Sequence, residues 1–319
     1  MASSTPMKIF FLFSFFIVLG SSFAARQLAV DATGSYPVMR FEYHKGPLLA
    51  GNFSVNLIWY GSFTAAQRAI VSDFITSLSP SAAKAQAHPS VSSWWATLSK
   101  YYRLAKPNSA TAARPATINL GSQRLDAAYS AGKSLTVASF QSLASKTYAT
   151  LNTISVILTS SDVAVEGFCA TRCGTHGHIG TSATTGVPLI WVGNPGTQCP
   201  GLCAWPFHQP VYGPQGPPLV APNGDVGMDG LVINLATLLA GTATNPFGGG
   251  FFQGPKEAPL EAASACPGVY GSGAYPGYAG DLLVEGASGA SYNANGVNGR
   301  KYLLPGLFDP ETQTCSTLV

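Results

Sequence analysis

The first strongly patterned segment of the chain reads Phe53-Ser54-Val55-Asn56-Leu57-Ile58-Trp59-Tyr60-Gly61. It is rich in β-branched and aromatic residues and alternates in part, which predicts a strand. Apolar residues then recur at helical spacing over residues 69–78, and Thr64 stands where its hydroxyl can cap the first turn. A strand that leads directly into a helix is a basic unit of a layered α/β fold.

The same alternation of strands and helices continues along the chain. Short β-rich runs predict strands over residues 116–120, 153–159 and 186–193, and helical spacing predicts helices over residues 90–102 and 137–149. The most hydrophobic internal run, residues 226–243, predicts a buried helix that ends at Asn245-Pro246. We therefore expect an α/β layered domain with a mainly parallel or mixed sheet.

Glycine and proline mark the parts of the chain that lack this pattern. The chain holds 35 glycines and 23 prolines, which are dense over residues 206–222 and 248–299. Both residues interrupt regular structure, so these segments are predicted to be long loops held by disulfides or by packing. No repeat of fixed period occurs, and residues 26–319 are expected to form a single domain.

Residues 1–25 have the pattern of a secretory signal peptide. Lys8 precedes an apolar run over residues 9–19, and small residues lead to Ala24 and Ala25, where cleavage is expected. The run is shorter than the roughly 20 residues of a membrane-spanning helix. We expect a secreted protein with no membrane anchor after cleavage, and a glycosylation site at Asn52 in Asn52-Phe53-Ser54.

The charge of the chain gives little basis for a charged partner. Lys and Arg number 17 and Asp and Glu number 14, so the net charge is +3, and only 10% of the residues are charged. Such a composition offers no basic stripe, so nucleic acid is not expected as a partner.

Four of the six cysteines gather within residues 169–203, with histidines close by. Their spacing suits a structural zinc site, whereas an exported protein with an even number of cysteines usually pairs them. Export favours disulfides, although the sequence leaves the connectivity open. The cysteines are Cys169, Cys173, Cys199 and Cys203, with Cys266 and Cys315 as a natural further pair, and His176, His178 and His208 supply nitrogens in the zinc alternative.

Two pairs of residues are weak candidates for metal binding or acid–base chemistry. His176 and His178 fall on one side of the chain if that segment is extended, but no Glu or Asp stands near them in the sequence. Asp225 and Asp229 resemble part of a cation loop, yet aspartate here is more commonly a turn or helix-capping residue. No G-x-S-x-G or H-E-x-x-H motif occurs, so we assign no catalytic residue, metal or cofactor.

Several longer strings of the chain are distinctive. They include Pro89-Ser90-Val91-Ser92-Ser93-Trp94-Trp95, Trp191-Val192-Gly193-Asn194, Cys203-Ala204-Trp205-Pro206-Phe207, Pro222-Asn223-Gly224-Asp225-Val226-Gly227 and Ala265-Cys266-Pro267-Gly268-Val269-Tyr270-Gly271. With these strings the chain resembles the plant phosphate-induced/EXORDIUM family over essentially its whole length after the signal. The resemblance implies a secreted protein of the apoplast or cell wall, linked to growth, cell expansion, brassinosteroid and nutrients, with no established enzymatic activity.

Some relatives in that family carry a His-Glu-x-x-Glu-like helical stretch that is similar to those of zinc-dependent hydrolases. Where those relatives place His, Glu and Glu, this chain has Thr237, Leu238 and Gly241, which cannot supply a metal site and a general base. We therefore expect a non-enzymatic growth-regulatory protein that binds an unidentified apoplastic or cell-wall ligand. The alternatives are a wall or peptide hydrolase that uses His176 or His178 with Asp225 or Asp229, and a passive wall component.

Overall fold

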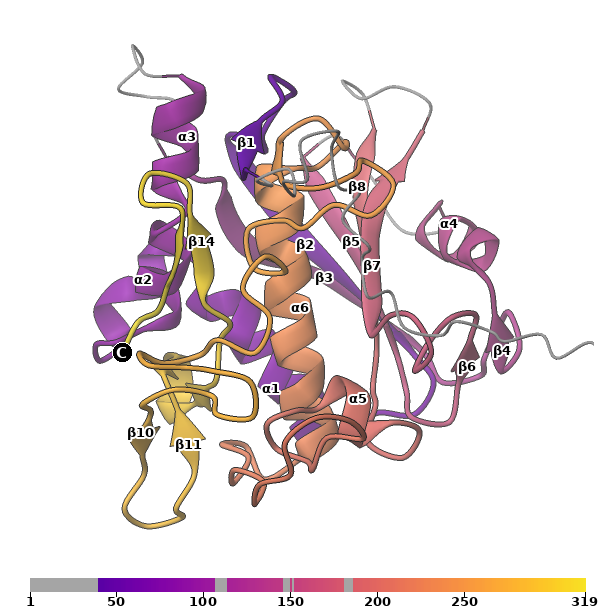
Figure 1. Ribbon diagram of the computed structural model, residues 1–319. Helices are drawn as coiled ribbons and strands as arrows, with labels where there is room; N and C mark the ends of the chain where they lie inside the picture. Colours follow the sequence, from indigo (N-terminus) through magenta and orange to yellow (C-terminus); the bar gives the residue numbers. More distant parts are fainter. Residues whose placement is uncertain (1–39, 107–113, 146–149, 151, 181–185) are drawn as a thin grey trace, which may run out of the picture. The chain divides into compact units, whose positions relative to one another are not determined.

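Five strands form the central sheet of the computed structural model, which describes residues 40–106, 114–145, 150, 152–180 and 186–319. Their spatial order is β3 (Thr117–Asp126), β2 (Asn52–Tyr60), β5 (Thr153–Thr159), β8 (Val187–Gly193) and β7 (Gly174–Ile179). The first four are parallel to one another, whereas β7 runs antiparallel to β8 at the edge. The sheet is therefore mixed and mainly parallel, as predicted (Figure 1).

Helices cover both faces of this sheet. Alternate residues of β2 point to opposite faces, so that Leu57 and Trp59 join one core cluster while Ile58 and Tyr60 join another. The first cluster also contains the buried apolar residues of α1 (Ala65–Ser77) and most of those of α6 (Val226–Thr244), and the second contains those of α4 (Val137–Ser145). This arrangement confirms the layered α/β fold, with α6 packed in front of the sheet in Figure 1.

Helix α1 begins where the sequence predicts it. The Thr64 hydroxyl accepts a hydrogen bond from the backbone N–H of Gln67 at 3.1 Å, and the Gln67 side chain accepts one from the Thr64 N–H at 3.0 Å. This reciprocal capping box satisfies two amides that have no partner inside the helix.

The helix predicted over residues 90–102 is divided into α2 (Val91–Ala96) and α3 (Ser99–Ala105). The N–H groups of Thr97 and Leu98 bond three residues back, to Trp94 and Trp95, so the helix tightens at this point. Both tryptophans are buried as expected, and their indole N–H groups donate to backbone carbonyls at 2.8 Å.

Helix α6 matches the predicted buried helix. It is long and apolar enough to cross a membrane, but 78% of its most apolar window is buried inside the fold. Such burial is typical of a core helix rather than of a membrane span.

The Gly- and Pro-rich segments form loops and very short strands, as predicted. Buried side-chain hydrogen bonds hold these loops in place. The Asn293 side chain makes three of them, because it donates to the carbonyls of Tyr270 and Leu304 and accepts from the Leu304 N–H. The remaining elements are β1 (Glu42–Tyr43), β4 (Ser134–Leu135), β6 (Ala164–Val165), α5 (Pro200–Cys203), β9 (Phe251–Phe252), β10 (Leu283–Val284), β11 (Ser291–Tyr292), β12 (Ala294–Asn295), β13 (Lys301–Tyr302), β14 (Leu307–Asp309), β15 (Thr314–Ser316) and two 3-10 turns, Pro80–Ala85 and Val297–Gly299.

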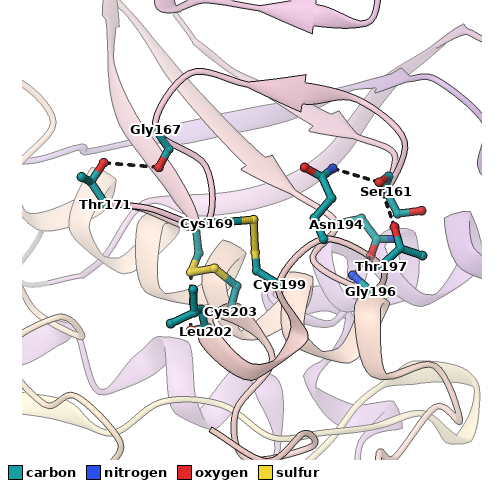
Figure 2. Close-up of a disulfide and its surroundings, with 12 residues drawn as sticks. Ser161, Gly167, Cys169, Thr171, Asn194, Gly196, Thr197, Cys199, Leu202 and Cys203 are labelled. Carbon is teal, nitrogen blue, oxygen red and sulfur yellow. Dashed lines mark hydrogen bonds between the residues drawn. A yellow bond between two sulfur atoms is a disulfide. The ribbon is translucent and has the colours of Figure 1, made fainter. Parts of the chain in front are cut away.

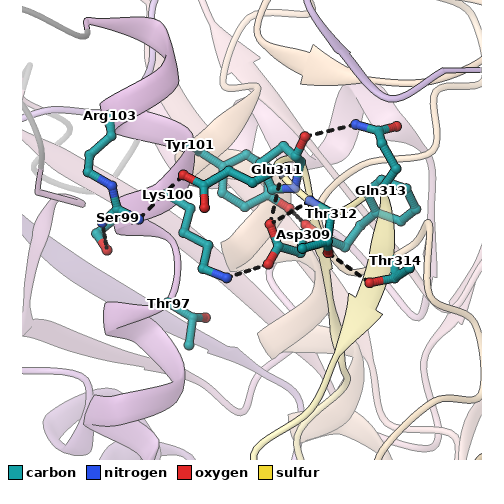
Figure 3. Close-up of polar contacts among 12 residues, drawn as sticks. Thr97, Ser99, Lys100, Tyr101, Arg103, Asp309, Glu311, Thr312, Gln313 and Thr314 are labelled. Carbon is teal, nitrogen blue, oxygen red and sulfur yellow. Dashed lines mark hydrogen bonds and ion pairs between the residues drawn. The ribbon is translucent and has the colours of Figure 1, made fainter.

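Polar contacts fasten the C-terminal hairpin of β14 and β15 to α3 (Figure 3). Lys100 forms an ion pair with Asp309, and the Tyr101 hydroxyl donates to the Phe308 carbonyl. The Asp309 carboxylate also accepts the backbone N–H of Glu311 at 2.9 Å. Because Asp309 is buried, these contacts compensate its charge and fix the end of the chain on the domain.

The predicted signal peptide and the end of the predicted helix at residues 146–149 lie outside the described residues. Asn52 is exposed at the first position of β2, and its glycosylation stays a prediction.

Candidate functional site

A groove of about 970 Å³ lies beside the edge strand of the sheet. One wall is β7, the floor is a stripe of α6, and the facing wall is formed by residues 245–248, 256–259 and 261. We call it the β7 groove. Its volume lies at the upper end of the range usual for ligand pockets, which makes it the best candidate for a binding site.

The floor of the β7 groove is the one part of the C-terminal half of α6 that faces solvent. Asn234, Thr237 and Leu238 are half-buried, and their neighbours along the helix are buried. They stand at positions i, i+3 and i+4, so they share one face of the helix.

A hydrogen-bonded chain of three polar side chains lies at one end of the groove. His176 Nε2 is 2.6 Å from Glu261 Oε2, and Asn245 Nδ2 donates to Glu261 Oε1 at 2.7 Å. The side chains of His176 and Glu261 are only 12% and 11% exposed. The Nδ1 atom of His176 is buried without a hydrogen-bond partner among the described residues.

Gly241 makes room for this arrangement. A Cβ atom at position 241 would lie 2.4 Å from Glu261 Oε2 and 3.1 Å from His176 Nε2. Both distances are shorter than normal van der Waals contacts. The missing side chain of Gly241 is therefore a condition for the His176–Glu261 pair.

The carboxylate partner of His176 could not be predicted from residues near the histidine in the sequence, because none of them is acidic. Glu261 lies 85 residues further along the chain, so sequence distance concealed it. One signal was present, because Glu261 stands between Leu260 and Ala262 in a short apolar run. A carboxylate at such a place is rarely buried unless it is paired.

His178 lies on the same side of β7 as His176, as predicted for an extended segment. Its ring meets Phe247 edge-on, with 5.2 Å between the ring centroids. Both histidines line the β7 groove together with Thr237 and Leu238. Within the described ranges, no three His, Cys, Asp or Glu side chains are arranged to hold a metal ion.

The structure does not bring Asp225 or Asp229 to the histidines. Asp225 caps the first turn of α6, where its Oδ1 accepts the Met228 N–H at 3.0 Å. Gly241, which contacts His176, lies 16 residues further along, or about 24 Å at the helical rise. The proposed hydrolase pairing of His176 or His178 with these aspartates is therefore wrong.

Replacing Asp225 by alanine is expected to lower the free energy of unfolding by about 1 kcal/mol, the usual effect of losing a helix cap. Asp225 also accepts a hydrogen bond from the Gln67 side chain at 2.9 Å, which links α6 to α1. Chemical denaturation measures the change. Asp225→Asn keeps the capping oxygen and should cost less than half as much, so equal losses in both variants would contradict a capping role.

Asp229 is the more unusual of the two aspartates. It is 3% exposed, and its carboxylate accepts the backbone N–H of Asn223 at 2.9 Å and the side-chain amide of Asn223 at 2.6 Å. Burial raises the pKa of Asp229 to about 7, although the hydrogen bonds from Asn223 act in the opposite direction. The native state therefore holds a proton that the unfolded chain releases at lower pH.

This raised pKa predicts that Asp229 makes the protein less stable as the pH rises from about 4 to 7. Below about pH 4 the carboxyl is protonated in both states and its contribution to stability is complete, and above pH 7 it is ionised in both and the contribution is gone. The difference is on the order of 4 kcal/mol. Denaturant unfolding curves measure the fall in the free energy of unfolding from pH 4 to pH 7. This fall should be smaller by that amount in Asp229→Asn than in wild type, and equal falls in the two proteins would refute the prediction.

The cysteines form disulfides, which decides between the two sequence alternatives (Figure 2). Cys169 pairs with Cys199 and Cys173 with Cys203, each across 30 residues. The further pair of Cys266 and Cys315 is confirmed as well. His208 is exposed, and its Nδ1 contacts the Gln209 carbonyl rather than the sulfur cluster. Since β7 begins directly after Cys173, the first two disulfides fix the start of the groove wall.

Comparison with known proteins accounts for nearly the whole chain. Residues 41–318 match the family model described as the phosphate-induced protein 1 conserved region. The protein EXORDIUM of Arabidopsis thaliana is 59% identical and covers 98% of this chain and 99% of its own length. The protein PHOSPHATE-INDUCED 1 of Nicotiana tabacum is also 59% identical, with 98% of both chains covered. No solved structure matches. The chain therefore belongs to the plant phosphate-induced/EXORDIUM family.

Proposed function

We propose that this chain is a secreted protein of the plant apoplast that regulates growth and cell expansion by binding a ligand in the β7 groove. The role is linked to brassinosteroid and nutrient supply, and it requires no catalysis by the chain. The observation that carries the proposal is the groove itself, which has a large volume and whose floor presents Asn234, Thr237 and Leu238. These three residues bring no ionisable group to the groove.

Two further findings support the proposal. The three disulfides suit an oxidising compartment and would not persist in the cytosol. The relatives that cover the chain include one whose name records induction by phosphate. Together with the pattern of residues 1–25, the disulfides favour action outside the cell, and the relative's name favours the link to nutrient supply.

The test is a growth assay in plants that lack their own members of the family. Thr237→Trp fills the floor of the groove with a large side chain, and Leu104→Trp is the matched control on an exposed helix position outside the groove. The wild-type chain and Leu104→Trp should restore growth, and Thr237→Trp should not, at equal levels in the extracellular fluid. Full growth with Thr237→Trp would overturn the role of the groove, and retention inside the cell would overturn secretion.

A further inference from the structure

We propose that the β7 groove binds an extended acidic peptide, which pairs with the outer edge of β7 as an added strand. The inference rests on the proposed function in that both use this groove. An exposed strand edge is a recognised docking site for extended peptides, because main-chain hydrogen bonds supply affinity and neighbouring pockets supply specificity.

The register of β7 shows which backbone groups face outward. The Gly193 N–H donates to the Cys173 carbonyl at 3.2 Å, and in an antiparallel pair the bonded positions alternate. Thr175, Gly177 and Ile179 therefore bond toward β8, whereas Gly174, His176 and His178 direct their N–H and C=O groups away from it. Pro188 stands opposite His178, at a non-bonded position where its missing N–H costs the pair nothing.

The outer edge of β7 has no partner strand among the described residues. In the part of the chain that the structure describes, β8 is the one strand that pairs with β7. Unprotected edges of this kind invite pairing with another chain, and proteins usually cover or charge them. Here the edge opens instead into a groove, so a second strand can approach it.

The surroundings of this edge suit the side chains of a strand. Leu238 on the floor and Pro246, Phe247 and Pro259 on the facing wall give the groove apolar surface. Successive side chains of a bound strand would point alternately toward this surface and toward solvent. An apolar residue at every second peptide position is therefore expected.

The placement of the charged residues in the groove adds a preference for an acidic residue in the peptide. Arg172 next to β7 and Lys256 on the facing wall are exposed, and neither lies within 4.0 Å of a described carboxylate. Glu261 is already hydrogen-bonded by His176 and Asn245. Because the exposed Glu257 adjoins Lys256, the acidic peptide residue is expected at the Arg172 end.

The first experiment selects binders from a library of randomised octapeptides, acetylated and amidated at their ends, on the mature secreted protein. Calorimetry then compares His178→Pro with His178→Ala, which differ in the outward N–H but both lack the imidazole. Gly177 precedes the substitution and has no Cβ to meet the proline ring. The selected peptides should be acidic and bind His178→Pro at least about tenfold more weakly, a loss of roughly 1.4 kcal/mol.

A second measurement needs only the wild-type protein, in case His178→Pro does not fold. Methylating the peptide nitrogens one at a time should weaken binding at alternate positions, since every second N–H of an added strand faces its partner. The proposal falls if the library gives no binder, if binders are not acidic, if both His178 variants bind alike, or if methylation shows no alternation. In any of these cases, loss of growth with Thr237→Trp would still support the proposed function. Conversely, peptide binding as expected together with full growth in Thr237→Trp would support the peptide site and overturn the proposed function.

Discussion

Removing both disulfides between residues 169 and 203, by changing all four cysteines to alanine, is expected to lower the free energy of unfolding by about 6 kcal/mol. Removing either one alone should cost only about 2.7 kcal/mol, so the two single losses should sum to less than the double loss. The two bridges are interlocked, because Cys173 lies inside the loop closed by Cys169 and Cys199 while Cys203 lies outside it.

The reason for this pattern is the size of the loop that each bridge closes. The first bridge to form closes a 30-residue separation, which in the chain-entropy treatment contributes about 3.6 kcal/mol. Once it exists, the second closes a ring of roughly ten residues and adds about 2.7 kcal/mol. Whichever bridge is removed, the other still closes the long loop.

Denaturant unfolding of the two single-bridge variants and the double variant measures these differences. The matched control removes the separate bridge between Cys266 and Cys315, which closes 49 residues and should cost about 4 kcal/mol. Its effect should add to either single loss, because it shares no loop with them. Single losses of about 3.6 kcal/mol each, with a double loss equal to their sum, would show instead that the bridges act independently.

Replacing Glu261 by alanine is expected to lower the free energy of unfolding by about 3 kcal/mol. The carboxylate is the hydrogen-bond partner of Asn245, which is 2% exposed, and of the nearly buried His176. Without it one largely buried nitrogen of each side chain loses its hydrogen-bond partner in the protein, and each such atom typically costs about 1–3 kcal/mol.

Two variants serve as controls for this prediction. Glu257→Ala alters an exposed carboxylate on the same wall and should stay within about 0.5 kcal/mol of wild type. Glu261→Gln keeps the shape of the side chain and one acceptor oxygen. Its loss of unfolding free energy should therefore lie between the losses of Glu257→Ala and Glu261→Ala. A stability of Glu261→Ala close to that of Glu257→Ala would mean that the pair with His176 contributes nothing to the fold.

The parts of the fold that depend on local pattern were predicted well. The strand over residues 153–159 has the bounds of β5, because an uninterrupted β-branched run is buried on both faces of a parallel sheet. Helix α6 extends one residue past its predicted end, where Asn245-Pro246 stops it. Strand β3 runs well past the predicted residue 120, because its polar second half lies on a sheet edge and shows no apolar pattern.

The candidate site was harder to predict, because proximity in space creates it. Strand β7 reads Gly-Thr-His-Gly-His-Ile, and pairing with β8 rather than local preference makes it extended. The two histidines and the altered α6 positions were identified from the sequence, but the groove that unites them was not. The link between His176 and Glu261 needs the chain to fold before the residues meet.

The attachment of Cys203 to α6 has a consequence for how a ligand would bind. The Cys203 carbonyl accepts a hydrogen bond from Asn234 at 2.8 Å, and a Cβ at Gly230 would lie 3.0 Å from the same oxygen. The Cys173–Cys203 disulfide thus connects the start of β7 to Cys203, and the hydrogen bond from Asn234 connects Cys203 to the helix that forms the groove floor. Wall and floor are tied together before any ligand arrives, so little ordering entropy of the protein is lost on binding. The β7 groove should act as a preorganised receptor whose association rate is set by encounter rather than by closure.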